Sequence, residues 1–180
     1  MSFTASPHLV TSPLADLIAE LDDITANVAD VGRPPAVAAA LSDYLGCTNL
    51  LAPQHLRSSP TSDQANVVHV APSGAYSVAA LVWRRGQRTP VHDHRGWCVV
   101  GVHAGSEVER SFSWSHGRLV ERARRRYDVG GITWMTESDD DIHEVTASTA
   151  GVSIHVSGLD LRTTSSSIRT TYPPPLDVAA

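Results

Sequence analysis

The residues best suited to chemistry lie in the stretch "TPVHDHRGWCVVGVHAG", residues 89–105. His92 and His94 are separated by one residue, and Cys98 follows four residues later. In a β-strand the side chains at positions i and i+2 point to the same face, so these two imidazoles can converge on one ion. A His-x-His pair alone is a weak signal, but Pro90 disfavours a helix here. The stretch predicts a metal site, with Cys98 on the same face if the strand stays regular.

Such a site needs a third ligand, and two further histidines are candidates. His143, in "SDDDIHEV", follows an acidic turn and opens a predicted strand, which suits a ligand brought in from a distant strand. His155 alternates with Ser153 and Ser157 along one face of the strand "VSIHVSG". It is a candidate ligand, a partner of the site, or a hydrogen-bonded core histidine. The other histidines are expected at the surface or as structural residues in strands: His8, His55, His69, His103 and His116.

Two helices are predicted before the strands begin. Residues 12–32 carry apolar residues at helical spacing, with Ser12 as a cap and Pro13 at the first helical position. Gly32 and the prolines after it are expected to end this helix. A shorter, alanine-rich helix is predicted over residues 35–45, ended by Gly46, and residues 53–66 read as a polar connector.

From residue 67 the sequence consists of short β-rich runs separated by turn residues, with no helical pattern among them. This arrangement is typical of an antiparallel sandwich or barrel. The predicted organisation is one compact, mainly all-β domain. It has a helical cap and connector over residues 1–66, a β-barrel over residues 67–162, and a proline- and serine-rich tail over residues 163–180 that wraps the surface or frays.

Composition excludes several classes of protein. Hydrophobic residues make up 42% of the chain and charged residues 18%, as in a globular domain. A net charge of −5 argues against a nucleic-acid partner, which requires a basic surface. Neither a signal peptide nor a membrane span is predicted. With only Cys47 and Cys98 present, a disulfide between them is not favoured, and a cytoplasmic location is expected.

The glycines and histidines together have a recognisable spacing. Gly86, His92, His94, Cys98 and Gly105 resemble the first cupin motif, in which a glutamate usually stands at the place of Cys98. The second motif is weaker, because His143 occupies its histidine place while Asp140 and Ala147 replace the usual glycine and asparagine. A cupin with this cysteine is similar to the thiol dioxygenases, namely the cysteine dioxygenase family and its bacterial mercaptopropionate-oxidising relatives. The resemblance extends from about Val67 to Leu161.

The resemblance implies a cupin fold, the double-stranded β-helix or jelly-roll barrel, with a small N-terminal helical cap. It implies that His92, His94 and His143 hold Fe(II), although three histidines also accept other divalent metals. Three neutral ligands leave the ion its full charge, which favours a substrate thiolate. The implied reaction oxidises a small thiol to a sulfinate with O2. The residues implied to line or support the pocket are Cys98, Ser153, His155 and Ser157.

The chain departs from this family in three respects that affect the substrate, one of which is the bulk of Trp97 beside Cys98. Family members carry a Ser-x-His-x-Tyr run, but here Ser157 stands in place of the tyrosine, so no crosslink between that tyrosine and Cys98 can form. The arginine that grips the substrate carboxylate in animal-type enzymes aligns with Asn66 or Val67, with Gln64 nearby. A thiol other than cysteine is therefore expected. Two alternatives stay open: a cupin metalloenzyme acting as an isomerase, C–S lyase or non-thiol oxygenase, and a cupin that binds a small molecule without turnover.

Overall fold

The computed structural model describes residues 12–59, 64–138, 141–164 and 166–174. Within these ranges the chain forms ten strands, three α-helices and two short 3₁₀ helices at Asp30–Gly32 and Pro53–His55. The helices are α1 (Pro13–Asn27), α2 (Arg33–Ser42) and α3 (Leu161–Thr164). The strands are β1 (Gln64–Val70), β2 (Ser77–Trp83), β3 (Val91–His94), β4 (Cys98–Ala104), β5 (Ser106–Ser115), β6 (Arg118–Asp128), β7 (Ile132–Met135), β8 (Ile142–Ala147), β9 (Gly151–Ser157) and β10 (Ile168–Tyr172).

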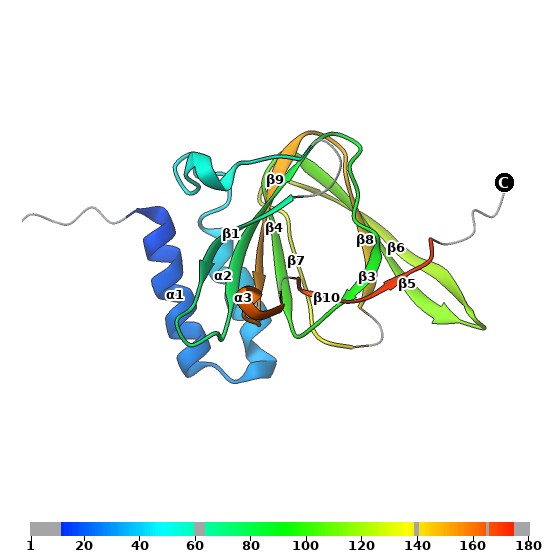
Figure 1. The fold of residues 1–180 in the computed structure, drawn as a ribbon, viewed down its shortest axis with the longest axis horizontal. Coiled ribbons are helices and arrows are strands. Elements are labelled where there is room, and N and C mark those ends of the chain that lie inside the picture. Colours follow the sequence, from blue (N-terminus) through cyan, green and yellow to red (C-terminus); the bar gives the residue numbers. More distant parts are fainter. Residues whose placement is uncertain (1–11, 60–63, 139–140, 165, 175–180) are drawn as a thin grey trace, which may run out of the picture.

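The strands form two antiparallel five-stranded sheets that face each other (Figure 1). One sheet has the order β1-β2-β9-β4-β7 and the other β10-β3-β8-β5-β6. Across β2 to β9, the first strand pairs with the last, the second with the last but one, and so inward to the β5–β6 hairpin. This nested pairing is that of a jelly roll, the double-stranded β-helix of cupins. The predicted fold class, including the helical cap, is confirmed.

The first sheet is buried on both faces because the helices cover its outer side. Along β2, Val78 and Ala80 pack into the core shared with Leu17 and Leu41 of the helices. The alternate residues, among them Ala79, point into the barrel. The side-chain period of two in a strand explains why β2 reads as an almost continuous apolar run. The helical cap thus stabilises the wall of the barrel from outside.

The two helices differ from the sequence prediction at their junction. Ser12 caps α1 as expected, accepting a hydrogen bond from the backbone N–H of Ala15 at 3.2 Å. However, α1 ends at Asn27, because Val28 is already extended. Arg33 begins α2, and Pro34 then occupies one of its first helical positions. Proline tolerates the first turn of a helix, since its missing N–H has no partner there, so these prolines start α2 and do not simply stop α1.

Part of the segment expected to be a tail is a strand. Strand β10 pairs antiparallel with β3, the strand that carries His92 and His94. The side chains of Arg169 and Tyr172 in β10 donate hydrogen bonds to the carboxylate of Asp93 at 2.7 and 2.9 Å. Burial alone would raise the pKa of Asp93, but these bonds hold it below its usual value. The tail therefore clamps the outer side of the short strand β3.

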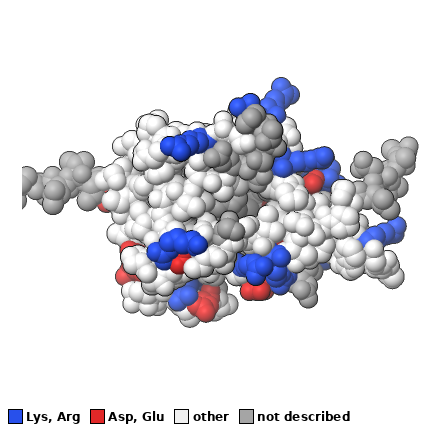
Figure 2. All heavy atoms as spheres, in the orientation of Figure 1, with Lys and Arg blue, Asp and Glu red and all other residues white. Residues whose placement is uncertain are grey.

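The surface carries its charges in separate clusters. Figure 2 shows one face of the molecule, on which arginines lie in scattered groups, several beside acidic residues, around a largely uncharged centre.

Among the described residues, no helix is long and apolar enough to cross a membrane. The expectation that the chain has no nucleic-acid partner stays a prediction.

Candidate metal centre

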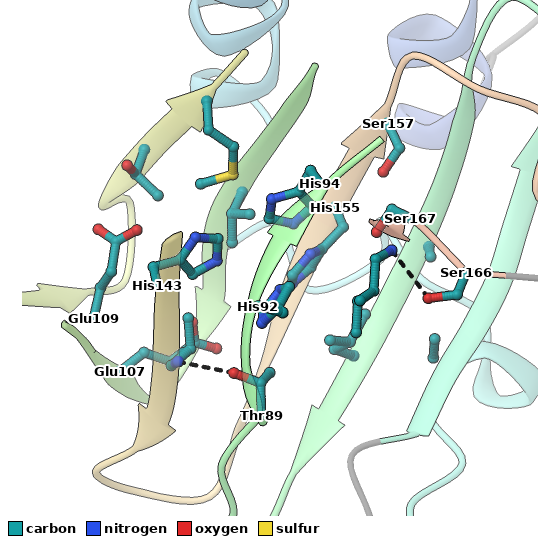
Figure 3. A pocket seen from close by; sticks show the side chains of 18 of the residues that line it. Thr89, His92, His94, Glu107, Glu109, His143, His155, Ser157, Ser166 and Ser167 are labelled. Carbon is teal, nitrogen blue, oxygen red and sulfur yellow. Dashed lines mark hydrogen bonds between the residues drawn. The ribbon is translucent and has the colours of Figure 1, made fainter. Parts of the chain in front are cut away.

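Three histidines from two neighbouring strands meet inside the barrel. His92 in β3 lies directly opposite His143 in β8, and His94 lies two residues further along β3. Their ring centroids are 4.5 to 4.9 Å apart, and one potential ligand atom from each lies within 4.8 Å of the others. All three side chains are buried. Figure 3 shows the rings turned toward one another, an arrangement that could hold one metal ion.

The hydrogen bonds of these histidines fit metal binding. In each ring the Nδ1 atom faces an oxygen: the Pro90 carbonyl for His92 at 2.9 Å, the Asp141 carboxylate for His94 at 3.0 Å, and the Asp141 carbonyl for His143 at 3.2 Å. A carbonyl oxygen or an ionised carboxylate can only accept, so Nδ1 carries a proton and Nε2 is the nitrogen left for a metal. Metal-binding histidines almost always have such an outer partner. The site therefore fits a divalent metal held by three imidazoles through Nε2.

Electrostatics favour the neutral form of His92. Its pKa is lowered to about 3, chiefly by burial and in smaller part by the neighbouring His143 and His94. A neutral imidazole is the form that binds a metal, so no proton has to leave His92 near neutral pH. Asp141 is the negative counterpart. Burial would raise its pKa, but hydrogen bonds from His143 and His94 hold it below its usual value.

A cavity of about 160 Å³ opens beside the three histidines. Most of its wall is apolar and comes from both sheets, with Leu81 and Val102 as examples. Its polar lining includes His155 and Ser157, which the sequence analysis singled out, together with Glu107 and Glu109 from β5. No arginine or lysine occurs among the described residues that line it. Such a small, largely apolar cavity suits a short organic ligand.

Trp83, Ser153 and His155 form a hydrogen-bonded chain that ends at the cavity wall with His155. The indole N–H of Trp83 donates to the Ser153 hydroxyl at 2.8 Å, and Ser153 lies 3.0 Å from Nε2 of His155. Because the Trp83 N–H can only donate, the Ser153 hydroxyl proton is left for an acceptor, and both Nε2 of His155 and the carboxylate of Glu107 can take it. Burial lowers the pKa of His155 to about 3, with a further contribution from the three metal-site histidines. His155 is therefore a neutral, oriented group facing the cavity and not part of the three-histidine cluster.

Cys98 lies in the other sheet from His92 and His94, so the expectation of one regular strand carrying all three is wrong. Strand β3 ends at His94, the chain turns at Gly96 with φ +67°, and Cys98 begins β4. The thiol is fully buried, 3.5 Å from the hydroxyl of Ser157, and is not among the cavity-lining residues. Burial raises its pKa to about 12. Cys98 therefore supports Ser157 as a protonated thiol. Both cysteines are free.

Several residues near the site were not predicted. Asp141 holds two of the metal-site histidines, and Glu107 and Glu109 face the cavity. The alternation in "SEVERS" places Glu107 and Glu109 on the same strand face, a signal that sequence alone cannot assign to the inside or the outside. Of the substrate-gripping positions considered, Val67 lines the cavity. Asn66 instead donates a hydrogen bond to the Arg57 carbonyl at 2.9 Å. His8 and Asp140 lie outside the described residues, as does the side chain of Gln64.

A second recess adjoins the cavity on the β6 side. It has a volume of about 350 Å³ and shares Glu109 and His143 with the first cavity. Arg125 of β6 lines it, opposite Glu109 in the β5–β6 register. Arg125 is not among the site residues predicted from the sequence. The structure therefore places one guanidinium beside the site but outside the cavity itself.

No protein-family model matches the chain. Among solved structures, it is similar to an RmlC-like cupin protein from Desulfovibrio desulfuricans, with 19% identity over 57% of this chain and 88% of that one, at a TM-score of 0.39. KdgF from a Halomonas species has 17% identity over 57% and 85%, at 0.43. A variant of salicylate 1,2-dioxygenase from Pseudoaminobacter salicylatoxidans has 14% identity over 62% and 30%, at 0.45. At these low scores the fold assignment rests on the strand pairing described above.

Proposed function

We propose that this chain is a mononuclear non-haem iron enzyme that oxidises a small thiol to a sulfinate with O2. The observation that carries the proposal is the set of three buried histidines, each with its Nδ1 hydrogen-bonded to an oxygen, at the wall of a small and mostly apolar cavity. Nitrogen ligands on one face suit a ferrous ion and leave other coordination positions for substrate.

The reaction balances without a further reductant. A thiol and O2 give a sulfinic acid, RSH + O2 → RSO2H, in which the S–H bond and the O–O bond break and two S–O bonds form. The sulfur loses four electrons, and the two oxygen atoms gain them. The thiol proton ends on the sulfinic acid or in solvent. No other redox partner is therefore required by the proposal.

A bound Fe(II) would supply adjacent positions for a thiolate and O2, and its undiminished charge would favour the thiolate over the thiol. The chain's own residues do the rest. His92, His94 and His143 hold the ion, and the apolar wall excludes water from the sulfur. His155, fixed by Ser153 and Trp83, and Ser157, contacted by Cys98, present polar groups to the cavity from the sheet opposite the metal-site histidines.

The test is O2 consumption by the Fe(II)-loaded protein with a panel of thiols, together with mass spectrometry of the product. We expect a sulfinate that carries two oxygen atoms from ¹⁸O2. His92→Ala and His143→Ala should each abolish both metal binding and uptake. His116→Asn is the matched control, because His116 is exposed on a turn with φ +49° that asparagine tolerates.

A protein that binds the metal but consumes no O2 with any thiol would overturn the proposal. Product formation from another substrate without O2 uptake would then indicate isomerase or lyase chemistry. Tight binding of a small molecule without turnover would indicate a binding protein.

A further inference from the structure

Glu107 is the most conspicuous polar group in the cavity that the proposed reaction leaves without a role. It lies on β5 with only 4% of its surface exposed, and it lines the cavity. Its Oε1 atom is buried and has no hydrogen-bond partner among the described residues. A buried polar atom without a partner is costly, and native proteins seldom keep one without a function. The cavity therefore presents a carboxyl oxygen that a ligand could satisfy.

The strand register places Glu107 at the end of the cavity away from the metal site. Along the β5–β8 ladder, Ser111 lies opposite His143, Glu109 opposite Val145, and Glu107 opposite Ala147. At a rise of about 3.3 Å per residue, Glu107 lies about 13 Å of strand length from the metal level, less the reach of its own side chain. Figure 3 shows Glu107 and Glu109 on the same side of the cavity as His143. A short ligand reaches Glu107 where the glutamate side chain extends along the cavity toward the metal, and it does so with the end opposite its sulfur.

We propose that Glu107 determines substrate specificity by accepting a hydrogen bond from a cationic amine, so that the cavity selects short aminothiols over thiols that end in a carboxylate. This inference rests on the proposed function, since it assumes that the sulfur lies at the metal. An ammonium group would donate to the unpaired Oε1 and would complement the carboxylates of Glu107 and Glu109.

The charges lining the cavity favour this choice. Glu109 accepts a hydrogen bond from the Tyr127 hydroxyl at 3.1 Å, and a hydrogen bond with Ser153 favours the ionised form of Glu107. Oε1 of Glu107 is nevertheless the buried carboxyl oxygen of the cavity that has no partner among the described residues. No arginine or lysine among the described lining residues could neutralise a substrate carboxylate. A carboxylate would therefore be desolvated beside like charge. Burial raises the pKa of Glu107 to about 7, and an adjacent cation would favour its ionised form.

The competing arrangement would use Arg125. A thiol bound in the second recess could place a carboxylate on this guanidinium, which lies beside Glu109 and His143. That arrangement predicts the opposite preference, for mercapto acids. It also predicts that the preference among the thiols is lost on replacing Arg125 and not on replacing Glu107.

The experiment compares cysteamine, 2-mercaptoethanol and 3-mercaptopropionate, which differ mainly in the group at the end of a short chain. Binding is measured anaerobically on the Co(II)-loaded protein from the thiolate-to-metal absorption band, and turnover is measured on the Fe(II) form. We expect cysteamine to bind at least about tenfold more tightly than 3-mercaptopropionate. Glu107→Gln should remove this preference and Glu109→Gln should reduce it only in part, while Arg125→Gln should keep it.

Two readouts separate the two proposals. Selective binding of cysteamine to the Co(II) form without O2 uptake by the Fe(II) form would overturn the dioxygenase function and support the role of Glu107. Equal or tighter binding of 3-mercaptopropionate by the unaltered protein would overturn the role of Glu107, whether or not the thiol is oxidised. Because this last comparison needs no variant, it holds even if Glu107→Gln does not fold.

Discussion

The carboxylate of Asp141 binds His94 twice. Its Oδ2 atom accepts from the backbone N–H of His94 at 3.1 Å and from Nδ1 of the same residue at 3.0 Å. The two residues are 47 positions apart in the sequence, and both are almost completely buried. One carboxylate therefore fixes both the end of strand β3 and the orientation of the imidazole that it carries.

Replacing Asp141 should weaken metal binding without removing any ligand. Without the carboxylate, the His94 ring loses the acceptor that holds its proton on Nδ1 and its lone pair on Nε2. We expect Asp141→Ala to raise the Kd for Co(II) or Zn(II) by about 10- to 100-fold, and Asp141→Asn by less, because an amide oxygen can still accept. A competition titration with a chromophoric chelator measures this.

Asp128→Asn is the control for loss of a carboxylate, since Asp128 is exposed on β6 and pairs with Arg126. An unchanged Kd for Asp141→Ala in a folded protein would show that the histidine orientation is set by packing alone.

The two cysteines should differ sharply in reactivity. Cys98 is fully buried with its pKa raised to about 12, while Cys47 is partly exposed. Thiol reagents react with the thiolate, and about one in 10⁴ of the Cys98 thiols would be ionised at pH 8 even with access. We expect a disulfide reagent to modify one thiol per native chain at pH 8 and two after unfolding. Cys47→Ala should remove the fast reaction. Rapid modification of both thiols in the native protein would contradict the buried position of Cys98.

The sequence predicts the parts of this site that depend on local spacing. The i, i+2 rule brings His92 and His94 to one face, and the cupin-like spacing indicates His143 as their neighbour on another strand. It fails where a contact depends on how the sheets close. Asp141 and Asp93 find partners 47 and 76 residues away, and Glu107 faces inward because of the register of β5 with β8.

The same reason explains the error at Cys98. The regular alternation from His92 to Cys98 assumes one continuous strand, but the chain crosses from one sheet to the other between them. Gly96, with φ +67°, makes that crossing. A glycine in a strand pattern can mark such a bend, yet its effect on the facing of later residues depends on the tertiary structure.

Gly105, at the turn between β4 and β5, should resist substitution for two reasons that can be separated. Its φ is +79°, and a Cβ there would lie 2.5 Å from the Ala150 carbonyl oxygen. Gly117 has φ +75°, but a Cβ there would meet nothing within 4 Å. We expect Gly117→Ala to lower the free energy of unfolding by about 1 kcal/mol, and Gly105→Ala by about 3 kcal/mol or more. Chemical denaturation of both variants measures the difference. Equal losses would mean that the close approach to Ala150 relaxes at little cost.

Glu107 should make the metal-free protein less stable as the pH rises. Its pKa is raised to about 7 by burial, from an ordinary value of 4.5, so the folded state holds the proton more tightly than the unfolded state. The stabilisation from protonation is complete below pH 4.5 and is lost as the pH rises through 7. It amounts to about 3 kcal/mol at most. Glu107→Gln has no proton to lose. We therefore compare the two proteins at each pH. The free energy of unfolding of Glu107→Gln minus that of the unaltered protein should rise by about 2 kcal/mol from pH 5 to pH 8.

Urea unfolding at both pH values, with a chelator present, measures this difference. The titrations of His92 and His155 occur in both proteins and cancel in the comparison. Asp128→Asn, at the exposed end of β6, controls for the loss of one carboxylate. A cation at Oε1 would stabilise the ionised form of Glu107. In a separate measurement without chelator, cysteamine bound to the Co(II)-loaded protein should therefore reduce the difference in free energy of unfolding between the two proteins at pH 8. If the difference in free energy of unfolding between the two proteins does not change with pH, solvent reaches the Glu107 carboxyl group in the folded protein. The preference for an amine would then lack the desolvation on which it depends.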